Sequence, residues 1–211
     1  KSNKFGIPIQ QAESIFAYAH SLSAIDVIGV DCHIGSQITE LSPFLNALHK
    51  VKELIFRLRD HYGMNIYYLD LGGGLGITYD AETPPHPAEY AQAIVEKTQD
   101  LDCTLIFEPG RVIVGNAGIL LTKVLYTKQN EDKRFVIVNA GMQTLIRPAL
   151  YNSYQRIVPV QNPERETVIV DIVGPICESG DFLGKDRPLP RVESEELLAV
   201  MSSGAYGFTM A

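Results

Sequence analysis

The sequence predicts an α/β fold in which a region of alternating helices and strands precedes a mainly antiparallel β region. Up to about residue 115, helical and strand patterns alternate along the chain, which is typical of parallel strands joined by crossover helices. After that point, short β-rich runs follow one another with turns between them, which indicates antiparallel pairing. The element lengths of the first region suit a barrel and an open doubly wound sheet equally well.

Three helices and three strands are expected in the first region. Apolar residues recur at helical intervals in 10–22 and 42–62, and a further helix is expected at 88–99 after a proline-rich loop. In the second helix, Ser42 and Pro43 suggest an N-cap and a first turn. Apolar runs predict buried strands at 25–33, 66–71 and 104–108.

The second region is expected to be built from strands joined by turns. It contains no long helical pattern, no internal repeat and no low-complexity tract. The strands are predicted at 119–126, 135–139, 167–173 and 197–201.

Composition narrows the classes of function. The chain has 211 residues and a net charge of −7 without a basic stripe, which argues against a nucleic-acid partner. No apolar run approaches the ~18 residues of a membrane span. The cysteines Cys32, Cys103 and Cys177 lack CxxC spacing, which disfavours a disulfide framework or structural zinc and favours a reducing cytoplasm. Both ends read as cut, so we expect a fragment of a longer protein.

Two predicted strands end in groups that could hold an anion. The first is followed by Gly72, Gly73 and Gly74, whose backbone N–H groups can approach a phosphate closely. A tight turn without ligand explains this cluster equally well, and the pattern is not that of a nicotinamide-binding loop. The second strand ends in Glu108, three residues before Arg111. These two could form an internal salt bridge, or they could face a cationic ring nitrogen and an anionic group.

A third strand end carries His33 and Ser36. A histidine there is most often a satisfied polar residue, but it could also stack on a flat cofactor or donate a proton. A metal site is disfavoured because no second histidine or clustered carboxylate lies at ligand spacing. The Ser36 hydroxyl could bind a phosphate.

Three segments of the β region carry further polar groups. Arg147 and Tyr151 lie four residues apart, Cys177 and Glu178 are adjacent in a turn that also contains Asp181, and Tyr206 stands between glycines. Each segment alone reads as a structural turn. Together they offer what a zwitterionic diacid requires: arginines for carboxylates, a carboxylate for an ammonium group and a thiol as an acid.

In their order along the chain, these motifs resemble the fold-type III pyridoxal-phosphate-dependent decarboxylases, and within that family the diaminopimelate decarboxylases. The resemblance covers the whole chain. Its motifs are KFG (4–6), HIGSQ (33–37), LDLGGGLG (69–76), EPGR (108–111), IRPALY (146–151), GPICESGD (174–181) and GAYG (204–207). It implies that residues 1–115 form the last part of a (β/α)8 barrel that binds pyridoxal 5′-phosphate, and that 116–211 form an incomplete C-terminal β domain.

The resemblance also implies a role for each site residue. His33 would stack on the pyridine ring, Ser36 and Gly74 would contact the phosphate, and Glu108 would hydrogen-bond the ring nitrogen. Pro109, Gly110 and Arg111 would border the phosphate. Substrate would be bound by Arg111, Arg147, Tyr151, Glu178 and Tyr206, with Tyr206 also touching the cofactor. Cys177 would be the proton donor, and in this family it reaches across from the partner subunit of a homodimer together with Glu178.

The activity implied is decarboxylation of meso-2,6-diaminopimelate to L-lysine and CO2, a step of lysine biosynthesis. The family's Schiff-base lysine lies in a motif like Tyr-Ala-x-Lys-Ala-Asn, which this chain lacks, so the fragment alone is expected to be inactive. Asn139 and Gln143 stand where Asp and Asn are expected. Two alternatives stay open: a decarboxylase of ornithine, arginine or carboxynorspermidine, and a non-catalytic relative that binds the cofactor.

Overall fold

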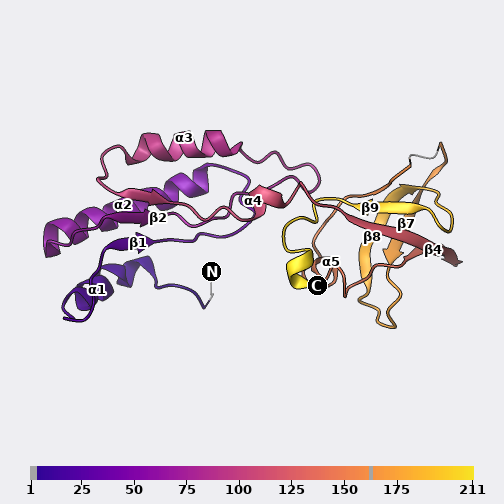
Figure 1. Ribbon diagram of the computed structural model, residues 1–211, viewed down its shortest axis with the longest axis horizontal. Coiled ribbons are helices and arrows are strands. Elements are labelled where there is room, and N and C mark those ends of the chain that lie inside the picture. Colours follow the sequence, from indigo (N-terminus) through magenta and orange to yellow (C-terminus); the bar gives the residue numbers. More distant parts are fainter. Residues whose placement is uncertain (1–3, 162–163) are drawn as a thin grey trace. The chain divides into compact units, whose positions relative to one another are not determined.

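The computed structural model describes residues 4–161 and 164–211, and these form two compact units (Figure 1). Unit 1 contains the chain up to Gly76 together with Pro84–Gly110, and unit 2 contains Ile77–Thr83 together with Arg111–Ala211. The loop at 77–83 therefore belongs to unit 2, although it lies between two elements of unit 1 in the sequence. The domain boundary expected after residue 115 stays a prediction, and Lys1 lies outside the described residues.

Unit 1 is a three-stranded parallel sheet whose strands alternate with helices, as the sequence predicts. Its strands pair in the order β1-β2-β3, all parallel, with Val30 opposite Leu69 and Leu69 opposite Leu105. Three helices precede or connect the strands (Figure 1). The elements are α1 (Ile9–His20), β1 (Gly29–Asp31), α2 (Ser42–Tyr62), β2 (Tyr68–Asp70), α3 (Pro87–Thr98) and β3 (Thr104–Ile106).

The long helix α2 supplies more of the apolar core of unit 1 than any other element does. Its buried side chains recur at helical spacing and form one face. Gly63 ends the helix in the left-handed conformation, with a φ of 64°. Ser42 is not the N-cap that the sequence suggests, because the cap position is Leu41 and no side chain caps the helix. The buried residues of α2 are Phe44, Leu48, Val51, Leu54, Ile55 and Leu58.

The outer strands of unit 1 are shorter and less buried than the sequence predicts. In β1 only Val30 is buried, and in β3 no residue is. Among the described residues both strands lie at an edge of the sheet, so each is hydrogen-bonded to one neighbouring strand. The central strand β2 is different, because Leu69 is fully buried between the two.

Unit 2 is a six-stranded sheet that is antiparallel apart from one pair. The order is β6-β9-β4-β5-β7-β8, and only β5 and β7 are parallel. The end strands β6 and β8 also contact each other, so the sheet curls towards closure. The elements are α4 (Arg111–Val114), β4 (Leu120–Asn130), β5 (Lys133–Val138), α5 (Arg147–Tyr151), β6 (Ile157–Pro159), β7 (Thr167–Val173), β8 (Phe182–Pro190), β9 (Leu197–Val200) and the 3-10 helix η1 (Phe208–Met210). This mainly antiparallel unit confirms the predicted fold class.

Several elements of unit 2 are not predicted from the sequence. The strands β6 and β8 and the short helices α4, α5 and η1 fall in segments expected to be turns. Within β8, Gly184, Pro188 and Pro190 interrupt any alternating pattern. Proline is tolerated there because β8 stands at the end of the strand order.

The inward faces of these strands form one apolar core. It draws on β4, β5, β7, β8 and β9, and Val124, Ile172, Leu183 and Leu198 within it have no exposed surface. No helix among the described residues is both long and apolar enough to cross a membrane.

The apolar core of unit 2 can be tested by mutating two neighbouring leucines of β9. Leu198 is fully buried, whereas Leu197 is 39% exposed because it points to the opposite face. We expect Leu198→Ala to lower the free energy of unfolding by about 2–5 kcal/mol, since it removes core contacts and leaves a cavity. The matched control Leu197→Ala should cost less than about 1 kcal/mol. Urea unfolding of both variants makes the comparison, and equal losses would contradict this core.

Candidate functional site

The glycine cluster after β2 brings together the ends of all three strands of unit 1. The Gly72 N–H donates to Asp70 Oδ1 at 2.8 Å, and the Gly72 carbonyl accepts from the Glu108 N–H at 2.8 Å. Gly72 has a φ of +62°, and a Cβ there would lie 2.9 Å from both the Cys32 carbonyl oxygen and His33 Nδ1. Only glycine both adopts this positive φ readily and leaves the space free that a Cβ would occupy.

The next two glycines are constrained by other backbone segments. A Cβ on Gly73 would collide with the Glu108 carbonyl oxygen, and a Cβ on Gly74 would collide with the Gly35 carbonyl oxygen. The Gly73 N–H approaches His33 Nδ1 at 3.4 Å, and the Gly74 carbonyl accepts from the Ile38 N–H at 2.8 Å. Close backbone packing is therefore a sufficient reason for these glycines. Phosphate binding at this place stays a prediction.

The residues of unit 1 that are predicted to serve a cofactor are accessible, apart from the half-buried Gly74. His33, Ser36, Glu108, Pro109 and Gly110 are all exposed in this chain. Their neighbour Cys32 is not, and burial, with Asp31 and Asp70 nearby, raises the pKa of its thiol to about 11. Cys32 is therefore protonated near neutral pH and is no candidate nucleophile.

In unit 2, arginine and tyrosine side chains alternate in one stack. The Arg111 guanidinium carbon lies 5.6 Å from the ring centroid of Tyr79 and 5.0 Å from that of Tyr206. The Arg147 guanidinium carbon lies 5.5 Å from the rings of both Tyr206 and Tyr151. The order is thus Tyr79, Arg111, Tyr206, Arg147, Tyr151. Four of these five were predicted as site residues, and the structure brings them together; Tyr79 was missed.

Tyr206 is held in the stack by a glycine-rich loop. The Ser203 N–H donates to the Gly118 carbonyl at 2.9 Å, and the Gly204 N–H donates to the Gly115 carbonyl at 3.1 Å. A Cβ on Gly118 would lie 2.5 Å from the Gly204 Cα, so the two backbones pack directly against each other. Tyr206 itself has a φ of +61°, which is uncommon for a residue with a side chain. The loop therefore fixes where the ring stands between the two arginines.

Arg147 retains hydrogen-bonding capacity. It is the first residue of α5, and its Nη1 approaches the Met210 sulfur at 3.9 Å. Its Nε is buried and has no hydrogen-bond partner within the described part of the chain. A buried guanidinium N–H without a partner is costly, and an anion would satisfy it.

The turn at 174–181 contains two carboxylates with different roles. Asp181 is buried, and its two oxygens accept from the Met142 N–H at 2.6 Å and the Ile176 N–H at 2.7 Å. Cys177 and Glu178 are exposed, and Glu178 Oε1 accepts from the Gly180 N–H at 3.0 Å. Asp181 thus shapes the turn that presents the other two side chains. The sequence did not predict this role for Asp181, because both donors are backbone N–H groups and one of them, in Met142, is 39 residues away.

Asn139 stands where the resemblance leads us to expect aspartate, and it fits its place. Its Oδ1 accepts from Thr122 Oγ1 and from the Lys123 N–H, both at 2.8 Å. An acceptor oxygen is what the position needs, and asparagine supplies one as well as aspartate does.

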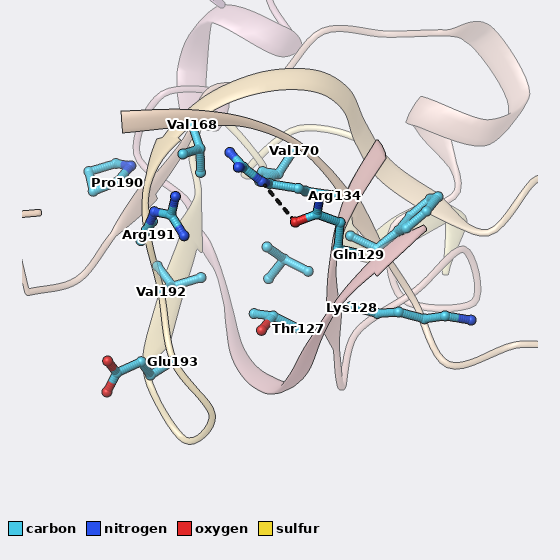
Figure 2. Close-up of a pocket in the computed structure, with 12 residues that line it drawn as sticks. Thr127, Lys128, Gln129, Arg134, Val168, Val170, Pro190, Arg191, Val192 and Glu193 are labelled. Atoms are coloured by element: carbon cyan, nitrogen blue, oxygen red, sulfur yellow. Dashed lines mark hydrogen bonds between the residues drawn. The ribbon is translucent and has the colours of Figure 1, made fainter. Parts of the chain in front are cut away.

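A separate hollow of about 310 Å³ lies at one end of the sheet of unit 2 (Figure 2). Figure 2 shows Arg134 and Arg191 at its wall, with Arg134 Nε donating to Gln129 Oε1 at 3.4 Å. Val168, Val170 and Val192 give it an apolar floor. None of the predicted site residues lines this hollow. Within 4–161 and 164–211, no group of three or more His, Cys, Asp or Glu side chains could hold a metal ion.

The structural role of Asp181 can be tested by mutation. Asp181→Ala leaves two partly buried backbone N–H groups without their acceptor, so we expect a loss of about 1–3 kcal/mol in unfolding free energy. Asp181→Asn keeps one acceptor oxygen and should lose less. The control Asp132→Ala, in the exposed turn between β4 and β5, should change stability by no more than about 0.5 kcal/mol. Urea unfolding provides the measurement; an Asp181→Ala variant as stable as the control would refute the role.

Comparisons with known proteins agree with the motifs. Residues 16–204 match the family described as pyridoxal-dependent decarboxylase, C-terminal sheet domain. The whole chain is 51% identical to the diaminopimelate decarboxylase of Vibrio cholerae and 53% identical to that of Pseudomonas aeruginosa, covering 50% of each relative.

Solved structures agree as well. The crystal structure of diaminopimelate decarboxylase from Helicobacter pylori complexed with L-lysine matches with a TM-score of 0.91 at 41% identity, covering 100% of this chain and 52% of that one. The chain thus spans about half the length of the relatives it matches. From the matched family, the level of identity and the shared fold, the chain belongs to the pyridoxal-dependent decarboxylases.

Proposed function

We propose that the protein carrying this chain is a carboxy-lyase that uses pyridoxal 5′-phosphate to convert meso-2,6-diaminopimelate to L-lysine and CO2. The observation that carries the proposal is the convergence of Arg111 and Arg147 on the ring of Tyr206. Two guanidinium groups in one stack suit a substrate with carboxylates at both ends. The names of the relatives, at about half identity over the whole chain, support the same substrate.

The residues of unit 1 fit the cofactor. The glycine cluster leaves no Cβ where the strand ends meet, and this lets backbone groups lie close to a phosphate. Ser36, Gly74 and Gly110 would contact that phosphate. His33 would stack on the ring, and the Glu108 carboxylate would hold a proton at the ring nitrogen. The chemistry that the bound cofactor supplies is that of its protonated ring, which accepts the electron pair that remains after CO2 leaves.

The remaining cofactor and substrate contacts come from unit 2 and from Pro109, near the end of unit 1. Pro109, next to Gly110 in sequence, would border the phosphate with Arg111. Arg111 and Arg147 would each hold a carboxylate, and the buried Nε of Arg147 gives that residue a donor for one. Tyr151 and Tyr206 would close over the substrate, and Tyr206 would also touch the cofactor.

The exposed pair in the turn at 174–181 would complete the chemistry. Glu178 would bind the distal ammonium group of the substrate. The Cys177 thiol would donate the proton that replaces CO2 on the product carbon. In the expected homodimer these two side chains would act in the site of the partner subunit. The lysine that attaches the cofactor would come from a segment outside this chain.

Two further features belong to the proposal. We place the protein in the cytoplasm, without a nucleic-acid or membrane partner, on the spacing of its cysteines and on its acidic charge. We assign residues 1–115 to the cofactor-binding barrel and 116–211 to the β domain.

The activity is tested with the full-length protein loaded with the cofactor. We expect it to release CO2 from meso-2,6-diaminopimelate, measured with carboxyl-labelled substrate. Cys177→Ala should lower kcat by about 100-fold or more, because it removes the proton donor. The matched control Cys103→Ser, at a thiol that contacts Arg59 and the Ile66 carbonyl at 3.2 Å, should keep kcat within about twofold. Wild-type protein that releases no CO2 would refute the proposal.

Glu178 tests which substrate the site prefers. Glu178→Asp shortens the side chain by one methylene, so the carboxylate no longer reaches the same ammonium group. We expect the ratio of kcat/KM for diaminopimelate to kcat/KM for ornithine to change by about tenfold. This is within the range of discrimination that a difference of one methylene produces. Parallel assays on ornithine, arginine and carboxynorspermidine make the comparison. An unchanged ratio would remove Glu178 from substrate recognition.

A further inference from the structure

We propose that Tyr79 is a positioning residue for Arg111, and that it sets the affinity for a carboxylate-bearing substrate by fixing the guanidinium before substrate arrives. The identity of that substrate rests on the proposed function. The placement of Arg111 by Tyr79 rests on the contacts of unit 2.

The loop at 77–83 is fastened to unit 2. The Thr78 carbonyl accepts from Asn116 Nδ2 at 2.8 Å and from Ser202 Oγ at 3.3 Å. Asn116 Nδ2 also donates to Ser202 Oγ at 2.8 Å. Asn116 follows α4 and Ser202 follows β9, so the loop is tied to the segments that carry Arg111 and Tyr206 in sequence.

Within the loop, Glu82 fixes the backbone at Tyr79. Its Oε2 accepts from the N–H groups of Tyr79 at 3.0 Å and Asp80 at 2.8 Å, and its carbonyl accepts from Thr78 Oγ1 at 2.8 Å. The hydrogen bond from the Asp80 N–H is the main cause that holds the pKa of Glu82 below its usual value. The carboxylate is therefore charged at neutral pH, and it braces the turn from which the Tyr79 ring projects.

Tyr79 contacts Arg111 in two ways. Arg111 Nη1 donates a hydrogen bond to the Tyr79 hydroxyl, and the guanidinium carbon lies 5.6 Å from the Tyr79 ring centroid. Tyr206 contacts the same guanidinium with its ring. Arg111 is half-buried, and its planar group is thus held by two aromatic side chains and one hydroxyl.

This arrangement lowers the cost of binding an anion. A free arginine side chain loses rotamer freedom when it binds a carboxylate, which subtracts from the affinity. Here the orientation is set in advance by Tyr79 and Tyr206. Removing Tyr79 would take away a hydrogen bond and an aromatic contact, and substrate would then have to supply more of the order of the Arg111 side chain. The effect should fall on substrate binding and not on the bond-breaking step, since Tyr79 acts through Arg111.

Two substitutions separate the contributions of the ring and the hydroxyl. In the full-length, cofactor-loaded protein, we expect Tyr79→Leu to raise KM for diaminopimelate about tenfold and Tyr79→Phe about threefold, with kcat within about twofold of wild type. The control is Tyr126→Leu, at a tyrosine of β4 that is 55% exposed and outside the stack. It should leave both constants unchanged. A fall in kcat that matches the rise in KM, or no rise in KM, would overturn the proposal.

A second measurement does not depend on activity. Phenylglyoxal modifies arginine side chains, and peptide mass spectrometry gives the rate at Arg111 alone. We expect modification of Arg111 to be about threefold faster in Tyr79→Leu than in wild type or Tyr126→Leu, because the guanidinium is less well held. Unfolding midpoints of the variants identify any general loss of structure. Equal rates would overturn the role of Tyr79, whereas an inactive wild-type protein with a faster rate in Tyr79→Leu would refute only the proposed function.

Discussion

The stacking of Arg111 and Arg147 on the ring of Tyr206 is the interaction on which the candidate site of unit 2 depends. Like charges repel when they are brought together, and an aromatic ring in contact with both attracts each cation. The three side chains come from segments far apart in sequence: the start of α4, the start of α5 and the loop after β9. The fold of the sheet therefore has to be complete before the stack can form.

Close backbone contacts through glycine make this possible in both units. In unit 1, Gly72, Gly73 and Gly74 let three strand ends meet at carbonyl oxygens. In unit 2, Gly118 and Gly204 pack backbone against backbone, which sets the start of the loop that carries Tyr206. The same property of glycine thus serves two purposes. It brings chain segments together, and it leaves main-chain groups near the place where polar side chains gather.

Local patterns were sufficient to predict much of the fold. The helix at 42–62 has the predicted bounds because its apolar period is long and regular. The strand β7 has the predicted bounds because all its residues except Asp171 are β-branched. The strand β8 was missed because its glycine and prolines mask the pattern. The edge strands of unit 1 were predicted to be buried, since sequence pattern alone gives no information about how many neighbours a strand has.

Sequence pattern gives no information about spatial neighbours, and this also explains which parts of the site were predicted and which were missed. Gly74, Glu108, Arg111, Cys177 and Glu178 stand in short motifs whose residue types suggest chemistry by themselves. Tyr79 and Asp181 are defined by contacts with distant segments: 32 residues separate Tyr79 from Arg111, and 39 separate Asp181 from Met142. Neither contact leaves a local signal.

Tyr79 and Asp181, the two residues that were missed, each position a residue that was predicted. A chemical requirement explains why the two tasks fall to different residues. A group that meets substrate must keep unsatisfied hydrogen-bonding capacity, so it cannot also be the group that holds the loop in shape. In the turn at 174–181 the two tasks are divided between neighbouring carboxylates: Asp181 is buried and accepts backbone N–H groups, while Glu178 stays exposed. In the stack they are divided between Tyr79, which orients, and Arg111, which would bind. In the turn, exposure marks the functional member and burial marks the member that positions it. In the stack both side chains are half-buried, and only their contacts distinguish the two tasks.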